Sequence, residues 1–390
     1  MKDEVPSVRN TAQRIAGLPF LYFILIVFIS IGAFPLLDNN IELFDFGSFY
    51  ASGLKAQKGE NPYDPNSEYI FEIVFQRVGA GGKMMNLNPP ISVILFRPLA
   101  NFDPFRTIVV WQIVAATFYL SSVFLLGAGY RHNVSLLLLL WSFSLAGFWH
   151  TLGLGQVYTF LLLLTSIGWV LHRSGKVILA GISIGLVVAI KPNFAVWLLF
   201  LWVWGYRHTV VASSITFLVV SMLPLMTYGV EIYRQWLEAS QPAMETLIMP
   251  GNNSMVGLTA RFGSAEVGIV ISLLLVAGLL LLVRSRKAQE KKSFEEASAL
   301  GIIASLLASP ISWTGYTIML LPIFFSLKEW SPRSLASAAV LTIPFGFVLR
   351  LFQASHFGFV VFGWLYGWAI LLLLWELVRN IMITRSIQTN

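Results

Sequence analysis

The chain has 390 residues, of which 56% are hydrophobic and only 12% are charged, and its mean hydropathy is +0.73. A soluble domain carries roughly twice this density of charged residues, so a soluble globular protein is excluded. Cysteine is absent, which excludes disulfides, thiol catalysis and cysteine-based metal sites.

The apolar runs are long, rich in leucine and not alternating, which indicates transmembrane helices rather than a β-barrel. We therefore predict an all-α, polytopic membrane protein that forms one integral membrane domain over residues 1–390. The net charge of +7 is the excess of Lys and Arg expected in cytoplasmic loops, so it indicates no nucleic-acid partner. No Gly-x-x-x-x-Gly-Lys-Ser/Thr loop and no His-Glu-x-x-His pattern occurs, which disfavours an ATP-driven motor and a zinc enzyme.

The first predicted crossing is the apolar run at 18–37, which is too long for a typical signal-peptide core. Lys2, Arg9 and Arg14 precede it and are expected on the cytoplasmic side, so this crossing runs outward. Residues 38–103 then form the first extracytoplasmic loop. Its apolar piece at 91–102 is too short to span the bilayer and is interpreted as re-entrant or interfacial.

The remaining chain alternates in direction, and every short inward loop carries Lys or Arg. We predict about twelve crossings (11–13), both termini in the cytoplasm and a plasma (inner) membrane location. A second extracytoplasmic loop is expected at 229–265. The later crossings are expected at 105–129, 134–149, 157–171, 177–190, 194–204, 210–228, 267–283, 300–309, 316–326, 335–349 and 357–378.

The first outer loop contains a helical pattern of aromatic and small residues between Phe46 and Gln57. This pattern predicts an amphipathic helix in the membrane interface that stops at Lys58-Gly59, followed by a second helix at about 67–78. Asp45 precedes the first of these helices. It is either a helix-capping residue or a partly desolvated carboxylate that acts as a general base.

Two cations are predicted on the outer side of the membrane, where the positive-inside rule disfavours them. Lys191 stands at a Pro192 break after an apolar run, and Arg261 lies in the second outer loop. Each either extends to the interface as an anchor or binds a phosphate group.

Several uncharged polar residues are also predicted on the outer side of the membrane. His150 and Gln156 flank a glycine-rich turn, Asn253 and Ser254 lie in the second outer loop, and Ser312 and Trp313 stand at a proline break. In one interpretation these side chains have structural roles: they hydrogen-bond to the backbone in turns or anchor the chain at the membrane interface. In the other interpretation they line a substrate site. The threading brings seven polar residues to one surface, which predicts a single site there: Asp45, His150, Gln156, Lys191, Asn253, Arg261 and Ser312.

Taken in order, seven short segments within residues 15–330 resemble the membrane glycosyltransferases of GT-C type, and most closely glycosyltransferase family 87, whose members use polyprenol-phosphate mannose. The segments are Phe44-Asp45-Phe46-Gly47-Ser48-Phe49-Tyr50, Gly59-Glu60-Asn61-Pro62-Tyr63-Asp64, Asn88-Pro89-Pro90, Gly155-Gln156, Ala189-Ile190-Lys191-Pro192, Asn252-Asn253-Ser254 and Ser309-Pro310-Ile311-Ser312-Trp313.

The resemblance implies a hexosyltransferase that moves a sugar, usually mannose, from a polyprenyl-phosphate donor to a hydroxyl of a lipid or glycan acceptor, with inversion. Asp45 matches the position of the general base, and Lys191 and Arg261 are expected to bind the donor phosphate. The expected substrate-binding residues are His150, Gln156, Tyr63, Asn253, Ser254, Ser312, Trp313 and Tyr316.

Two departures from the family pattern stand out. Asn252-Asn253-Ser254 replaces the usual Asn-Gln-Ser, and Thr314-Gly315-Tyr316 stand where a His often follows the Ser-Trp pair. The role of that His is therefore open to another residue such as His150 or Tyr316. No cofactor is expected. A divalent metal stays an alternative that the sequence does not indicate, because the outer carboxylates Asp64, Glu68 and Glu72 form no clear cage for one.

Other functions remain compatible with a polytopic chain. A lipid or glycan transporter or flippase would need ionisable residues near the midpoints of the crossings and repeat symmetry, and the sequence has neither. A glycan ligase or polymerase would carry larger outer loops with several arginines. A non-catalytic assembly subunit would be separated from all of these by an acceptor-transfer assay.

Overall fold

The computed structural model describes residues 21–34, 44–64, 86–130, 135–241, 244–285 and 293–388. Every secondary-structure element within these ranges is helical, which confirms the predicted all-α class. The early elements are a helix at Leu21–Phe34, α2 (Phe44–Lys58), α4 (Ile91–Phe96), η1 (Leu99–Asn101), α5 (Pro104–Gly129), α6 (Leu136–Ser144), α7 (Ala146–Leu154), α8 (Tyr158–Arg173), α9 (Val177–Ile190), η3 (Pro192–Phe194), α10 (Ala195–Trp204) and α11 (Arg207–Tyr228). The later elements are α12 (Glu231–Ala239), α13 (Met244–Leu247), α14 (Met255–Ala260), α15 (Ala265–Ser285), α16 (Phe294–Ala308), η4 (Thr314–Leu320), α17 (Leu321–Ser326), α18 (Pro332–Leu341), α19 (Phe345–Ala354), α20 (His356–Val361) and α21 (Leu365–Gln388).

Four described helices are long and apolar enough to cross a membrane: α5, α11, α15 and α21. Two bent pairs, α6 with α7 and α18 with α19, raise this number to as many as 6 if each pair is one span. The chain is therefore a multi-pass membrane protein by the length and composition of its helices, while the count of about twelve crossings is not confirmed.

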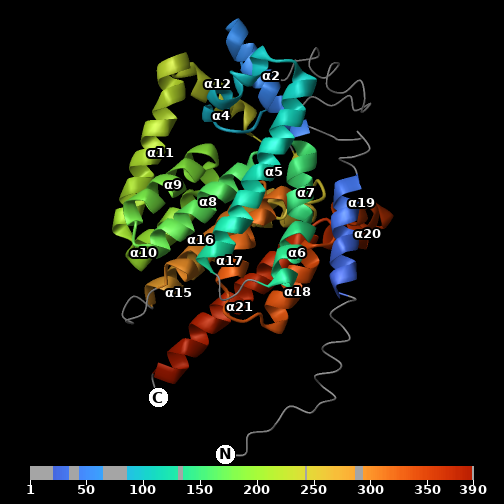
Figure 1. Ribbon diagram of the computed structural model, residues 1–390, viewed down its shortest axis with the longest axis vertical. Coiled ribbons are helices and arrows are strands. Elements are labelled where there is room, and N and C mark those ends of the chain that lie inside the picture. Colours follow the sequence, from blue (N-terminus) through green and yellow to red (C-terminus); the bar gives the residue numbers. More distant parts are fainter. Residues whose placement is uncertain are drawn as a thin grey trace, which may run out of the picture.

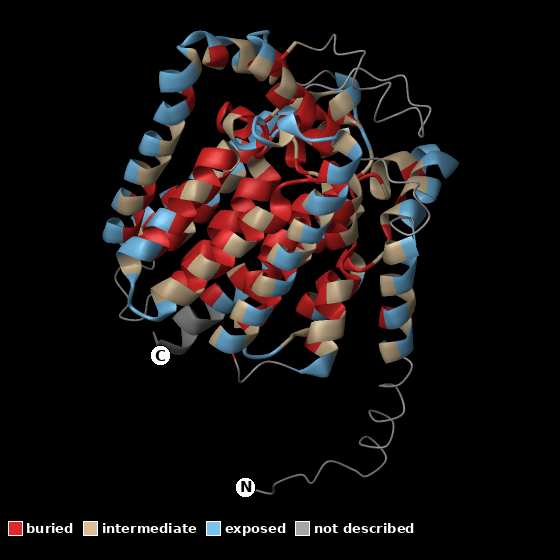
Figure 2. Ribbon diagram, turned by 45° about the horizontal axis from the view of Figure 1, so that its top comes forward, coloured by how far each residue is buried: buried red, intermediate tan, exposed pale blue. Residues whose placement is uncertain are grey.

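The difference arises from short helices in the middle of the bundle. The predicted crossing at 177–190 matches α9 residue for residue, yet a helix of 14 residues is only about 21 Å long and the hydrocarbon layer is about 30 Å thick. The helices α9 and α16 bury most of their side chains, and α10 buries half of its side chains. Figure 2 shows the buried residues in the middle of the bundle and exposed residues along the helices at its outer side. These short helices are hydrophobic on all sides because they are packed inside the protein, so their composition does not indicate that they span the membrane.

The segment predicted as one crossing at 335–349 is broken. It consists of α18 and α19, whose axes differ by 86°. Pro344 precedes α19 and has no backbone N–H to donate, so the helix of α18 does not continue through it. The predicted crossing is thus a bent pair of helices, which forms either one broken span or a re-entrant segment.

The first loop is helical, as predicted, but its helix does not lie free in the interface. Phe46 and Phe49 of α2 are 0% exposed, and the charged residue Lys55 is buried as well. The Lys55 ammonium donates a hydrogen bond to the Asp64 backbone carbonyl over 2.7 Å. The stop at Gly59 is confirmed, since its φ of +73° is favourable only for glycine. The predicted helix at 67–78 lies outside the described residues.

Figure 1 shows α2, α4 and α12 gathered at one end of the bundle, with the C-terminal end of α21 at the opposite end. The second predicted loop, 229–265, is also ordered, because α12, α13 and α14 occupy most of it. Helices from both predicted loops thus lie together at one end of the molecule.

Candidate functional site

Aromatic packing fixes the start of α2, where Asp45 lies. Phe49 stacks on Phe96 of α4 with ring centroids 4.6 Å apart, and Phe46 lies 6.3 Å from the ring of Trp111 in α5. The Trp111 indole N–H donates a hydrogen bond to the Gly155 carbonyl over 2.9 Å. These contacts join α2 to the turn between α7 and α8, next to Gln156.

That turn depends on glycine. Gly155 ends α7 with φ of +69°, a left-handed conformation that other residues adopt at a cost. The backbone N–H of Gln156 then donates to the Thr151 carbonyl over 2.9 Å, which closes the turn. Gln156 is 4% exposed and its side chain donates a hydrogen bond to the Asp45 carboxylate. The structure thus brings together two predicted site residues that lie 111 positions apart.

Asp45 is a half-buried carboxylate with unusual basicity. Burial raises its pKa to about 6, although the hydrogen bond from Gln156 and the positive charge of Lys191 act in the opposite direction. The group is therefore mostly ionised at neutral pH and still able to accept a proton near that pH. These are the properties required of a general base.

Lys191 lies where α9 gives way to η3, because Pro192 cannot continue the helix. Its ammonium lies 5.2 Å from the ring centroid of Tyr158 and 5.3 Å from that of Tyr316. It also donates a hydrogen bond of 3.4 Å to the Tyr316 hydroxyl. The two tyrosine rings stack with centroids 3.8 Å apart, so they hold the cation as a pair.

Asp45 and Lys191 influence each other without direct pairing. The charge of Lys191 acts on the Asp45 carboxyl, yet no ion pair within 4.0 Å joins these two residues. The site therefore presents a base and a cation as separate groups. Such an arrangement can take up a proton at one place and balance a negative charge at another.

Two loops meet beside η4 and are joined through their backbones. The Asn253 N–H donates to the Ser312 carbonyl over 2.7 Å, and the Ser312 N–H donates to the Asn252 side-chain oxygen over 2.9 Å. The Ser254 hydroxyl donates to the Pro310 carbonyl over 2.9 Å. The predicted residues Asn253, Ser254 and Ser312 are thus neighbours in space, and each is 1% exposed or less.

Several unsatisfied polar atoms lie around these loops. Buried atoms without a hydrogen-bond partner include Asn253 Oδ1, Ser312 Oγ, Thr314 Oγ1 and His150 Nδ1. An added Cβ on Gly251 would lie 2.6 Å from Thr314 Oγ1, which shows how closely the loop approaches η4. Buried polar groups normally have partners, so a cluster of uncharged exceptions indicates a place for a polar ligand.

Arg261 has a different environment from Lys191. Its guanidinium is 5% exposed and donates to the backbone carbonyls of Met249, Asn252 and Gly257, the shortest bond being 2.6 Å to Met249. Burial lowers its pKa to about 10, so it stays charged at neutral pH. These contacts stabilise the loop before α14, and the predicted phosphate contact of Arg261 stays a prediction.

Other predicted residues also have structural partners. The Tyr63 hydroxyl donates to the Asn88 carbonyl over 2.9 Å in a buried cluster with Val93 and Ile232. Ser254 caps the start of α14, and Trp313 packs partly buried against the core before η4. Among the described residues, no three His, Asp or Glu side chains gather closely enough to hold a metal ion.

Tyr158 was missed by the sequence analysis. It is fully buried and contacts both Tyr316 and Lys191. Its position two residues after Gln156 was the available signal, because the first turn of α8 must lie beside the same site.

A family model matches the part of the chain that includes Gln156, Lys191 and Asn253, but not Asp45, Ser312 or Tyr316. The model describes glycosyltransferase family 87 and covers residues 86–310, more than half of the 390 residues. No curated protein and no solved structure matches the chain, so the GT-C type of its fold stays a prediction.

Proposed function

Because the chain belongs to glycosyltransferase family 87 and is a membrane protein, we propose that it transfers a sugar, mannose in the first instance, from a polyprenyl-phosphate donor to a hydroxyl of a lipid or glycan acceptor. The observation that carries the proposal is the Asp45 carboxylate, with its pKa near 6, beside Gln156 and the separate cation of Lys191. A lipid-linked donor needs no nucleotide-binding motif, and the sequence contains none.

The proposed reaction is a single displacement. The acceptor hydroxyl oxygen forms a bond to the anomeric carbon of the sugar while the bond from that carbon to the phosphate oxygen breaks. The bonding electron pair leaves with polyprenyl phosphate, and Asp45 accepts the proton of the acceptor hydroxyl. Attack opposite the leaving group inverts the anomeric configuration, which requires the base and the leaving phosphate to stand apart.

Lys191 is proposed to bind the donor phosphate. Negative charge accumulates on the phosphate oxygens as the sugar leaves, and a fixed ammonium group stabilises that charge. Tyr158 and Tyr316 hold the ammonium from two sides. Tyr316 stands where related chains often carry His, and its contact with Lys191 supports the alternative that it serves the donor end of the site.

The uncharged cluster around Asn253 and Ser312 is proposed to bind the sugar hydroxyls. Asn253 Oδ1 accepts hydrogen bonds, and the hydroxyls of Ser312 and Thr314 both accept and donate them. His150 Nδ1 adds a further polar atom from α7. Neutral groups of this kind suit a sugar, which carries no charge to balance.

The donor class is tested with purified protein in nanodiscs and a panel of polyprenyl-phosphate sugars. We expect release of polyprenyl phosphate from the mannose-linked donor in the presence of an acceptor mixture, and no release of nucleotide from nucleotide sugars. Turnover with nucleotide sugars alone would contradict the assignment. Release of polyprenyl phosphate from a donor that carries a different sugar would support the proposed reaction and change only the identity of the transferred sugar.

We further propose that the α2 end of the bundle is extracytoplasmic and that both termini are cytoplasmic. The absence of native cysteine makes this testable with single cysteines. Glu60→Cys, after α2, and Ser174→Cys, after α8, are both at exposed positions. A membrane-impermeant maleimide applied to intact cells should label the first and not the second. Labelling of both from outside would overturn the topology.

Membership in a glycosyltransferase family favours transfer over the transporter and flippase alternatives. The described ionisable residue that lies deepest in a candidate span is Glu376 of α21, which is 5% exposed. Arg333 lies 3.3 Å from its carboxylate, so this acid has a structural partner. This ion pair supports a structural role for Glu376 rather than a role in transport.

A further inference from the structure

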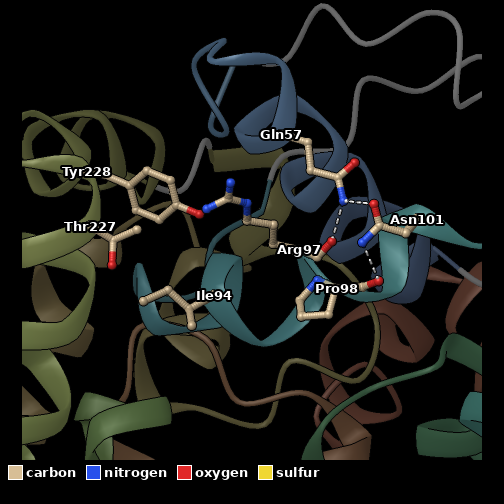
Figure 3. A pocket seen from close by; sticks show the side chains of 7 residues that line it. All are labelled: Gln57, Ile94, Arg97, Pro98, Asn101, Thr227 and Tyr228. Carbon is tan, nitrogen blue, oxygen red and sulfur yellow. Dashed lines mark hydrogen bonds between the residues drawn. The ribbon is translucent and has the colours of Figure 1, made fainter.

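A polar hollow lies beside the C-terminal part of α2, whereas Asp45 lies in the first turn of the same helix. It has a volume of about 440 Å³ and is formed by the C-terminal part of α2, the α4–η1 segment and the end of α11. Figure 3 shows the lining side chains, with Tyr228 on one wall and Gln57 and Asn101 on the other. The seven lining residues are Gln57, Ile94, Arg97, Pro98, Asn101, Thr227 and Tyr228.

The position of the hollow relates it to the membrane boundary. Tyr228 is the last residue of α11, an apolar helix of 22 residues that is long enough to span the hydrocarbon. Thr227 lines the hollow beside it, and the apolar side chains below Thr227 on the same face of α11 are exposed, with Leu223 at 45% and Val219 at 56%. Leu95 of α4 is exposed beside the hollow as well. A lipid whose acyl chains lie along this face of α11 would have its headgroup at the level of Tyr228.

The charge of the hollow is positive. Arg97 is exposed, and its guanidinium lies 5.9 Å from the ring centroid of Tyr228. Within the described ranges, no carboxylate lies within 4.0 Å of this guanidinium. The Tyr228 hydroxyl is buried without a hydrogen-bond partner, and Figure 3 shows it directed toward Arg97. A guanidinium and a phenol beside each other are donors suited to phosphate oxygens.

The walls of the hollow are held by hydrogen bonds. The Gln57 amide donates to the Arg97 carbonyl over 2.6 Å and to the Asn101 side-chain oxygen over 3.0 Å. The Asn101 amide donates to the Pro98 carbonyl over 3.2 Å. These bonds hold the backbone of Arg97 in place and leave the guanidinium directed into the hollow.

The hollow is separate from the reacting groups. Gln57 follows Asp45 by 12 residues on the same helix, α2, which corresponds to about 18 Å along its axis. The hollow thus lies at the C-terminal end of α2, whereas Asp45 interacts with Gln156 and Lys191 at the N-terminal end of the same helix. Since the donor phosphate is proposed to lie at Lys191, a phosphate at Arg97 belongs to a second molecule.

We propose that this hollow binds the phosphate headgroup of an anionic phospholipid of the surrounding bilayer, with Arg97 and Tyr228 as its donors. The apolar face of α11 would accompany the acyl chains, and Ile94 and Pro98 would contact the glycerol region. The proposal can be tested without an assay of sugar transfer, because lipid binding at this hollow is measured as the amount of lipid that the protein retains.

The test is native mass spectrometry of the full chain released from nanodiscs that contain equal amounts of phosphatidylglycerol and phosphatidylcholine. Wild type should retain phosphatidylglycerol preferentially, and Arg97→Gln should reduce that retention about tenfold, as expected for the loss of charge-assisted hydrogen bonds. Arg106→Gln is the matched control, because Arg106 is an exposed arginine in the first turn of α5 and lies outside the hollow. It should retain lipid as wild type does.

Arg97→Lys keeps the positive charge and should retain more phosphatidylglycerol than Arg97→Gln, which separates recognition from a folding defect. A further arm adds inorganic phosphate at millimolar concentration. Displacement of the lipid by inorganic phosphate would assign the hollow to a free anion and overturn the lipid proposal. Equal retention by wild type and Arg97→Gln would also overturn it.

Discussion

Replacement of Asp45 by Asn is expected to lower the rate of sugar transfer by about a hundredfold to ten-thousandfold, the range typical for loss of a general base. The amide is nearly equal in size to the carboxylate, so the packing of α2 through Phe46 and Phe49 should persist. It cannot, however, take the proton of the acceptor hydroxyl. Donor binding should stay near normal while turnover collapses.

Asp103→Asn provides the matched control for this substitution. Asp103 is exposed and caps α5 through a hydrogen bond from the Arg106 N–H, and Asn caps helices about as well as Asp. Its transfer rate should equal that of wild type. Near-full activity of the Asp45→Asn protein would remove Asp45 from the mechanism, and the base would then be sought among Asp64, His150 and Glu68.

Replacement of Lys191 by Met is expected to weaken donor binding and to change the pH dependence of transfer. The phosphate loses its cation, and a charge-assisted contact contributes about 1.5–3 kcal/mol, so donor affinity should fall roughly tenfold or more. Because the charge of Lys191 lowers the pKa of Asp45, its removal should raise that pKa above 6. The acidic limb of the pH–rate profile should therefore move to higher pH.

Lys176→Met is the control for Lys191, because the two lysines flank opposite ends of α9. Because Lys176 is exposed, its replacement by Met should change neither donor binding nor the pH profile of transfer. If Lys191→Met binds the donor as wild type does and its pH profile is unchanged, Lys191 is only an interfacial anchor. A shift of the profile without a loss of donor affinity would separate its influence on Asp45 from phosphate binding.

Local patterns predicted the helix bounds well, since the end of α2 at Lys58-Gly59 and the whole of α9 were assigned from composition and periodicity. The role of each helix was harder to predict. Apolar runs such as α9 and α16 are hydrophobic on all sides both in lipid and inside a protein, so composition alone does not distinguish the two environments. The break between α18 and α19 had a local signal in Pro344, but the 86° angle between the two helices does not follow from that signal.

Some features of the candidate site could likewise be predicted from the sequence, and others could not. Asp45, Gln156 and Lys191 were predicted to converge because the threading placed them on one surface, and the structure brings these three together. Tyr158 was missed because an aromatic residue at the start of an apolar helix has no distinctive pattern. The partners of Arg261 are backbone carbonyls, and a sequence does not show which carbonyls a loop turns inward.

The most direct measurement is the single-turnover rate of sugar transfer between pH 5 and pH 8. Since Asp45 must be deprotonated to act as the base, the wild-type rate should rise with pH, reach half of its maximum near pH 6 and then level off. The small residual rate of Asp45→Asn should show no such limb. A wild-type rate that is constant across this range, or a limb that persists in Asp45→Asn, would contradict the assignment of Asp45 as the general base.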